Sequence, residues 1–300
     1  HWAQEMFDQA GMLRELVKWD YELRQPGQVG DVVARATEVA MTHPRGPVYM
    51  VLPREPLSAT LTEPIAPIKP RAQSARVHAD PASIATLADW IAHAERPLII
   101  ASILPGEAVP ALDHLAERFA IPVVTHNPRS VCLPSSHSMH FGYEPGMLLA
   151  DADLVIALES DVPWIPHLQQ PAAGARIAHV AEDPIFARYP MRSFPSDLSV
   201  QGGVTRSLEA LIEQLDGHFQ MAEARIAARR ARLTERMRTR RAQLAKDSAA
   251  GETISPAYLS RCIGEAVGED AVIFNEYSLR ADHCLREKPD TLFALGPAGG

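Results

Sequence analysis

The pattern of hydrophobic and polar residues changes period several times along the chain, and each change marks the end of one expected element. In residues 28–41 apolar side chains recur every three or four positions, which is the spacing of one helix face. Pro44 ends this pattern. Residues 47–52 are almost continuously apolar up to Pro53, which is typical of a strand buried on both faces of a sheet.

The alternation is most regular between residues 80 and 217. Asp80 and Pro81 are suited to begin a helix, because aspartate caps the first N–H groups and proline is tolerated in the first turn. Short apolar runs predict strands, and amphipathic stretches predict the helices between them. The expected strands are 97–101, 121–125, 153–158 and 175–180, with a helix over 107–119. This order predicts right-handed βαβ units and a parallel sheet.

A third block begins near residue 254, where Ser255 and Pro256 open an expected helix. Residues 271–274 are an expected strand, followed by a second helix and a strand over 291–295. That last strand runs into the glycine-rich turn 296–300, a context in which α/β proteins present N–H groups to a phosphate. Because ligands bind at the carboxyl ends of strands, we expect residues 275–278 and 296–300 to converge.

Two segments depart from the alternation. Residues 60–77 contain Pro64, Pro67 and Pro70 and predict an extended linker. Residues 217–250 are dense in arginine, and we expect a long, solvated helix that joins two domains. No aromatic residues accompany these arginines and the net charge is −8, so a nucleic-acid partner is not favoured.

Composition limits the class of protein. Three hundred residues allow about two domains of ordinary size. Cys132, Cys262 and Cys284 lie too far apart in sequence for a C-x-x-C zinc site, and three cysteines fit a reducing cytoplasm. No apolar run approaches the length of a membrane helix, so no membrane partner is expected. The first residue is His1 and the glycine turn stands at the other end, so we expect an internal segment of a longer protein.

The residues offer few ligand-binding motifs in the central block. A dinucleotide-binding fold typically carries the motif G-x-G-x-x-G after its first strand, but residues 102–106 contain one glycine and a proline. Carboxylates at Glu159 and Asp161 follow another strand, and only Glu182 suits a ribose. We therefore favour a sheet that no longer binds a dinucleotide. Three nearby histidines favour surface or capping roles over a metal site: His126, His137 and His140.

These segments together resemble thiamine-diphosphate-dependent enzymes, with acetolactate synthase large subunits and benzoylformate decarboxylase as the nearest members. The resemblance rests above all on residues 44–55, Pro-Arg-Gly-Pro-Val-Tyr-Met-Val-Leu-Pro-Arg-Glu. Residues 115–125, 151–156 and 182–184 resemble the central domain of that family, and residues 271–300 the opening of its diphosphate-binding domain.

The resemblance implies an α/β fold: a parallel-sheet, Rossmann-like central domain flanked by partial thiamine-diphosphate-binding domains. The implied division is 1–59, the end of the pyrimidine-binding domain; 60–79, a linker; 80–217, the central domain; 218–250, a helical connector; and 251–300, the start of the diphosphate-binding domain.

The resemblance also implies site residues. Gln4 and Lys18 match residues of the substrate channel. Positions next to the cofactor are matched by Asn275, Glu276, Tyr277, Ser278, Gly299 and Gly300. The implied cofactors are thiamine diphosphate and Mg²⁺, with the activating glutamate and the metal ligands outside this chain. FAD, which acetolactate synthases bind in this domain, is not favoured, because residues 102–106 and 159–164 replace the family's loops.

The implied function is a carbon–carbon lyase or transferase that acts on a 2-oxo acid, as a homodimer or homotetramer, with this segment inactive alone. Two alternatives stay open at this stage. One is an FAD- or NAD-binding oxidoreductase whose central block is the working domain. The other is a non-catalytic structural or interaction module.

Overall fold

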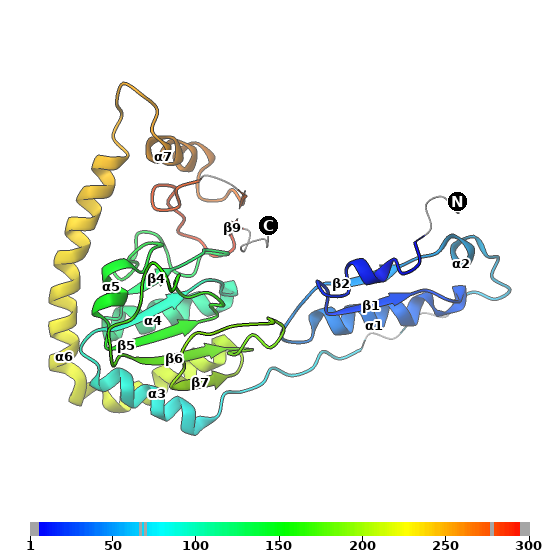
Figure 1. Cartoon of the computed structure of the whole chain (residues 1–300), viewed down its shortest axis with the longest axis horizontal. Helices are drawn as coiled ribbons and strands as arrows, with labels where there is room; N and C mark the ends of the chain where they lie inside the picture. Colours follow the sequence, from blue (N-terminus) through cyan, green and yellow to red (C-terminus); the bar gives the residue numbers. More distant parts are fainter. Residues whose placement is uncertain (1–5, 66–67, 69–70, 277–278, 295–300) are drawn as a thin grey trace. The chain divides into compact units, whose positions relative to one another are not determined.

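A computed structural model describes residues 6–65, 68, 71–276 and 279–294 (Figure 1). The chain divides into two compact units, His1–Arg76 and Val77–Gly300. Each unit has its own parallel strands, so the α/β class predicted from the alternation is confirmed. The finer division into five segments stays a prediction.

The first unit is one βαβ arrangement. Strand β1 (Trp19–Glu22) pairs in parallel with β2 (Val48–Val51), and helix α1 (Val29–Met41) connects them. Val32 and Ala36 of α1 are buried, one helical turn apart, as the apolar spacing predicts. Short turns of helix complete the unit: η2 (Ala10–Met12), η3 (Pro26–Gln28) and α2 (Arg54–Ser58).

The second unit is built on a five-stranded parallel sheet in the order β4-β3-β5-β6-β7. Its strands are β3 (Pro97–Ala101), β4 (Val123–Thr125), β5 (Leu154–Leu158), β6 (Arg176–Ala181) and β7 (Leu198–Gln201). Every residue of β3 and β5 is buried, because helices or loops cover both faces. The prediction of a parallel sheet from four apolar runs is therefore confirmed. Strand β7, which contains polar residues, is a fifth strand that the sequence did not predict.

Helices α3 (Pro81–His93), α4 (Val109–Phe119) and α5 (Gly146–Asp151) belong to the same unit, with the turn η4 (Gly106–Ala108) before α4. The predicted cap of α3 is present, since the Asp80 carboxylate accepts a hydrogen bond from the Ser83 N–H at 2.9 Å.

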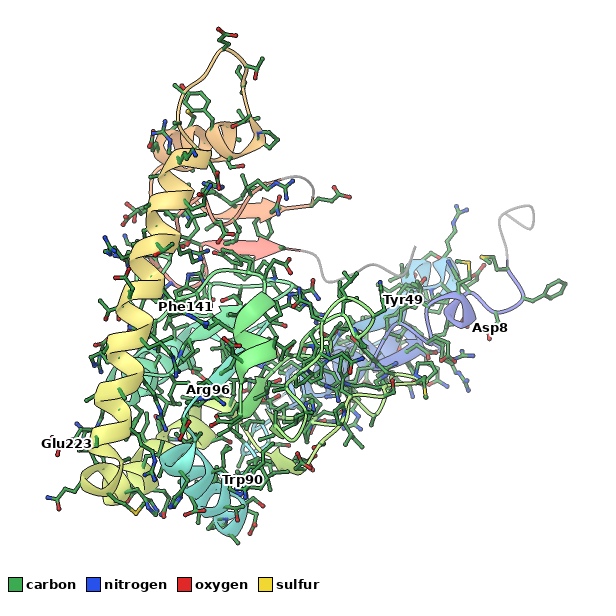
Figure 2. The ribbon with its side chains drawn as sticks, turned by 60° about the vertical axis from the view of Figure 1, so that its left-hand side comes forward. Asp8, Tyr49, Trp90, Arg96, Phe141 and Glu223 are labelled. Atoms are coloured by element: carbon green, nitrogen blue, oxygen red, sulfur yellow. The ribbon has the colours of Figure 1, made fainter. Side chains whose placement is uncertain are left out.

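Helix α6 (Val204–Asp247) has 44 residues and packs along α3 and α4 (Figure 1). The expectation of a solvated helix is wrong for one of its faces. Ala222, Ile226, Leu233 and Met237 form a buried stripe at helical spacing, while Glu223 beside them is exposed (Figure 2). The helix is long but polar, and no helix of the described residues is apolar enough to cross a membrane.

Arg229 occupies a position of that buried stripe and is only 1% exposed. Its guanidinium donates to the carbonyl oxygens of Ile91 at 2.7 Å, Ala94, and Phe119 at 3.2 Å. These carbonyls stand at the carboxyl ends of α3 and α4, where helices leave acceptors unsatisfied and favour a cation. One arginine thus caps two helices from a third.

The last elements are α7 (Pro256–Val267), β8 (Ile273–Asn275) and β9 (Leu292–Ala294). The Ser255 hydroxyl accepts from the Tyr258 N–H at 3.1 Å, so the predicted start of α7 is confirmed. The second helix expected between the two strands is wrong, because the described residues 279–290 form turns. The backbone N–H groups of Arg280 and Arg286 donate instead to the hydroxyls of Ser260 in α7 and of Ser135.

Candidate cofactor-binding edge

Strands β8 and β9 end at one edge of their sheet, and each precedes a predicted cofactor segment in the sequence. They pair in parallel, with Asn275 opposite Ala294, so both chains leave the sheet on the same side. Asn275 is half-buried at this edge and Glu276 is exposed. Tyr277, Ser278, Gly299 and Gly300 lie outside the described residues, so their predicted roles stay predictions.

Arg286 holds the other end of this strand pair. It is 1% exposed and donates to the carbonyl oxygens of Gly268 at 2.7 Å, Glu269 at 3.0 Å and Ala271. Its Nε also donates to the Thr291 hydroxyl at 3.3 Å. These partners lie just before β8 and just before β9, so one buried cation fixes the start of both strands. A search for ligand motifs misses Arg286, because its partners are backbone atoms.

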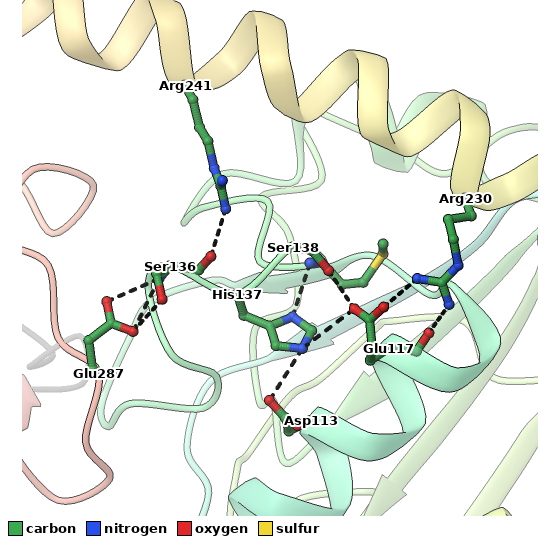
Figure 3. A network of polar contacts seen from close by, with 9 residues as sticks. Asp113, Glu117, Ser136, His137, Ser138, Arg230, Arg241 and Glu287 are labelled. Atoms are coloured by element: carbon green, nitrogen blue, oxygen red, sulfur yellow. Dashed lines mark hydrogen bonds and ion pairs between the residues drawn. The ribbon is translucent and has the colours of Figure 1, made fainter.

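The loop 134–138 joins this segment to the central sheet (Figure 3). The backbone N–H of Ser135 donates to the carbonyl of Arg286 at 3.0 Å, and the Ser135 hydroxyl accepts from the Arg286 N–H at 2.9 Å. The next serine, Ser136, donates its hydroxyl to the Glu287 carboxylate at 2.6 Å. The predicted diphosphate segment is thus attached to the loop that follows β4.

Two helices hold the same loop (Figure 3). The His137 Nδ1 accepts from the Met139 N–H at 3.0 Å, so its proton belongs on Nε2, which lies 3.2 Å from the Asp113 carboxylate of α4. The Ser138 hydroxyl donates to Glu117, and this bond, with the nearby Arg230 of α6, lowers the pKa of Glu117. The loop is therefore bonded to α4 through His137 and Ser138, and Arg230 of α6 bonds to the same Glu117.

Helix α6 makes two further contacts on this side. Arg241 donates to the carbonyl of Ser136 at 2.6 Å, and Arg240 forms an ion pair with Asp282. Gly142 has a φ of +89°, and a Cβ there would lie 2.1 Å from the Arg240 guanidinium. The positive φ favours glycine at 142, and a larger residue would also displace the end of the Arg240 side chain.

A cavity of about 570 Å³ lies beside these contacts. Its walls include Arg240 and Arg261, but each is already paired with a carboxylate, Asp282 and Glu265 respectively. Burial lowers the pKa of the lining residue His140 to about 3, so this imidazole is neutral. A third arginine of the lining, Arg241, donates to the backbone carbonyl of Ser136.

The two predicted channel residues lie in the first unit. Gln4 is outside the described residues. The Lys18 ammonium donates to the carbonyl oxygens of Val39 at 2.9 Å, Thr42 and Pro44 at 3.0 Å. These carbonyls lie at and just beyond the end of α1, so Lys18 caps that helix. Its channel role stays a prediction.

Two of the three neighbouring histidines and two of the three cysteines are buried. His126 and His140 are each 3% exposed, so the expectation of surface histidines is wrong for them. Among the described residues, no three histidine, cysteine or carboxylate side chains are grouped to hold a metal ion. Cys132 and Cys284 are buried, and burial raises the pKa of Cys132 to about 12, as expected of an unreactive thiol.

Comparison with known proteins finds the family that the sequence resembles. Residues 84–211, which hold β3 to β7 and the start of α6, match the family model described as the thiamine pyrophosphate enzyme, central domain. The resemblance seen in the sequence is therefore confirmed.

Curated relatives match beyond residues 84–211. A probable 2-ketoarginine decarboxylase of Pseudomonas aeruginosa is 28% identical over 281 residues, 90% of this chain and 47% of that protein. An acetolactate synthase of Mycobacterium bovis is 26% identical over 310 residues, 97% of this chain and 49% of that protein. The chain thus spans about half the length of the curated relatives it matches.

Solved structures share the fold. The crystal structure of benzoylformate decarboxylase from Polynucleobacter necessarius has a TM-score of 0.67 and 20% sequence identity, and the match covers 98% of this chain and 54% of that chain. Identity at this level establishes the architecture alone, so substrate and activity need their own evidence.

Proposed function

We propose that this chain is part of a thiamine-diphosphate-dependent lyase or transferase that breaks or forms a carbon–carbon bond of a 2-oxo acid. The observation that carries the proposal is the edge at Asn275, where parallel β8 and β9 end side by side, each just before a segment that the resemblance assigns to the cofactor. The named activities of the relatives, two decarboxylases and a synthase, support the reaction class.

The described residues fit one side of such a site. Carboxyl ends of parallel strands are where open α/β sheets bind ligands, and Asn275 offers an amide that can both donate and accept. Thiamine diphosphate, when bound, supplies a carbon nucleophile and an electron sink for decarboxylation. In this reading Asn275 orients bound ligand, and Arg286 keeps the two strand ends in register.

The remaining parts of the proposal come from the resemblance. Mg²⁺ accompanies the diphosphate and is held by residues outside this chain. The enzyme acts in the cytoplasm as a homodimer or homotetramer, without nucleic-acid or membrane partners. We expect residues 1–300 alone to be inactive, because the implied activating glutamate and metal ligands are not among them.

Binding of the cofactor tests the proposal. Calorimetry on the full-length gene product with Mg²⁺ should show that thiamine diphosphate binds at least about tenfold more tightly than thiamine, since the diphosphate is the anchored group. Asn275→Ala should weaken thiamine diphosphate binding, whereas Lys246→Ala, at an exposed position of α6, should not. Equal affinity for thiamine and its diphosphate would refute the proposal.

A further inference from the structure

The central sheet has a crevice position of the kind that binds nucleotides. Strands β3 and β5 are neighbours, but β4 lies on the far side of β3 and β6 on the far side of β5. The chain therefore departs in opposite directions from this pair, which makes the space beyond their carboxyl ends the topological switch point. Ser102 follows β3 here, and Glu159 and Ser160 follow β5.

The polar groups at this point are already bonded to one another. The hydroxyls of Ser102 and Ser160 lie 2.7 Å apart, and the two residues are 0% and 1% exposed. Ser102 also donates to the carbonyl of His126 at 2.7 Å. The backbone N–H of Leu104, two residues beyond Ser102, donates to the Ser130 hydroxyl at 2.9 Å. These groups are therefore not available to cradle a phosphate.

Residues 183–196, called the strap, supply a side chain to the same place. Arg192 of the strap donates through Nε to the carbonyl of Asp161 at 2.9 Å and through Nη2 to that of Ser160 at 3.3 Å. Its guanidinium lies 4.9 Å from the ring centre of Phe186 and 5.0 Å from that of Phe194. Two aromatic contacts from the strap itself hold the cation against the end of β5.

Tyr189 attaches the strap a second time. Its hydroxyl donates to the Asp161 carboxylate at 2.5 Å, and Asp161, 2% exposed, also pairs with Arg129. The positive charge of Arg129 is thus committed to a buried carboxylate. Glu159 and Glu182 lie next to this group, with the Glu182 N–H donating to the Glu159 carboxylate at 2.8 Å. An incoming diphosphate would meet carboxylates where it needs free N–H groups or arginine.

We propose that the strap fills the nucleotide crevice of this central domain, with Arg192 bonded to the end of β5. As a consequence, the domain binds no FAD, NAD or ADP. The inference does not depend on the proposed thiamine-diphosphate chemistry, because it concerns a different sheet edge. It also removes the basis for an oxidoreductase with this sheet as its working domain.

Equilibrium dialysis of the 300-residue chain with ADP, NAD⁺ and FAD tests whether the central domain binds a nucleotide. We expect no saturable binding of any of the three up to about 1 mM. Saturable binding of any one of them below that concentration overturns the proposal, whatever the catalytic activity of the protein.

Thermal unfolding of Arg192→Ala tests whether the strap is held in the crevice by Arg192. The substitution removes both bonds to the end of β5 and the packing of two rings, so we expect the Tm to fall by about 4 °C. Arg206→Ala, whose side chain is exposed on α6, is the matched control and should leave the Tm unchanged. An Arg192→Ala variant with the wild-type Tm overturns the proposal, because the arginine would then not be held in the crevice.

Discussion

Ser136 and Glu287 are joined by a hydrogen bond of 2.6 Å between hydroxyl and carboxylate, although 151 residues separate them in sequence. The same carboxylate accepts from the Ser136 N–H at 3.1 Å. This pair connects the loop after β4 to the turn before β9, so the predicted cofactor edge is fixed relative to the central sheet. Three other polar residues also determine stability: Arg286, Arg229 and Glu159.

Replacing Glu287 by alanine should weaken that attachment. Because the bonds are charged but lie near the surface, we expect the free energy of unfolding to fall by about 1 kcal/mol. Urea denaturation measures the change, with Glu252→Ala, an exposed carboxylate elsewhere in the chain, as the control. Equal losses in the two variants would show that the Ser136 contact does not stabilise the protein.

Arg286→Met should have a larger effect, because the new side chain leaves three carbonyl oxygens and the Thr291 hydroxyl without their donor. We expect a loss of about 3 kcal/mol in the free energy of unfolding. Arg286→Lys retains the charge and should recover part of it. Amide hydrogen exchange in β8 and β9 should accelerate in the methionine variant, and unchanged exchange there would contradict the assigned role.

Arg229 caps the ends of α3 and α4, and Arg229→Met removes that cap while keeping an apolar stem in the buried stripe of α6. The free energy of unfolding should fall by about 2–4 kcal/mol, because the carbonyls of Ile91, Ala94 and Phe119 lose a buried donor. Arg225→Met, on an exposed position of the same helix, should change it by less than about 0.5 kcal/mol. Similar denaturation curves for both variants would refute the cap.

Glu159 should make stability depend on pH. Burial raises its pKa to about 7 from an ordinary value of 4.5, so the folded state binds the proton more tightly than the unfolded state. The resulting stabilisation is complete below pH 4.5 and is lost as the pH rises through 7.

The variant Glu159→Gln isolates this contribution, since all other titrating groups are shared. Between pH 5 and pH 8 the wild type should lose on the order of 2 kcal/mol relative to the glutamine variant. Urea denaturation at several pH values measures the difference, and Glu213→Gln, at an exposed site on α6, serves as the control. Parallel pH profiles for wild type and Glu159→Gln would contradict the raised pKa.

Local signals predicted much of the fold. The caps at Asp80 and Ser255 mark real helix starts, and the buried runs at 97–101 and 154–158 are central strands, because apolar content and capping chemistry act over a few residues. The polar strands β1 and β7 gave no such signal. They form because a neighbouring strand offers a parallel partner, which is tertiary information.

The errors have the same cause. Arginine density suggested a solvated helix, but Arg229 is buried where two helix ends supply acceptors from over 100 residues away. The expected helix between β8 and β9 is replaced by turns that bond to distant serines such as Ser135 and Ser260. At the site, the pairing that places Asn275 at the same edge as Ala294 was predictable from the two apolar strands. The roles of Arg286 and of the strap were not predictable, because their partners are backbone carbonyls, which carry no sequence signature.

Turnover by the full-length gene product tests the central claim most directly. Carbon dioxide release should be followed with pyruvate, benzoylformate and 2-ketoarginine, with and without thiamine diphosphate and Mg²⁺. Release from at least one 2-oxo acid that requires thiamine diphosphate is the predicted result, because residues 84–211 match the central domain of that enzyme class. Release that is unaffected by removal of thiamine diphosphate, or no reaction of any 2-oxo acid by the cofactor-loaded protein, would contradict it.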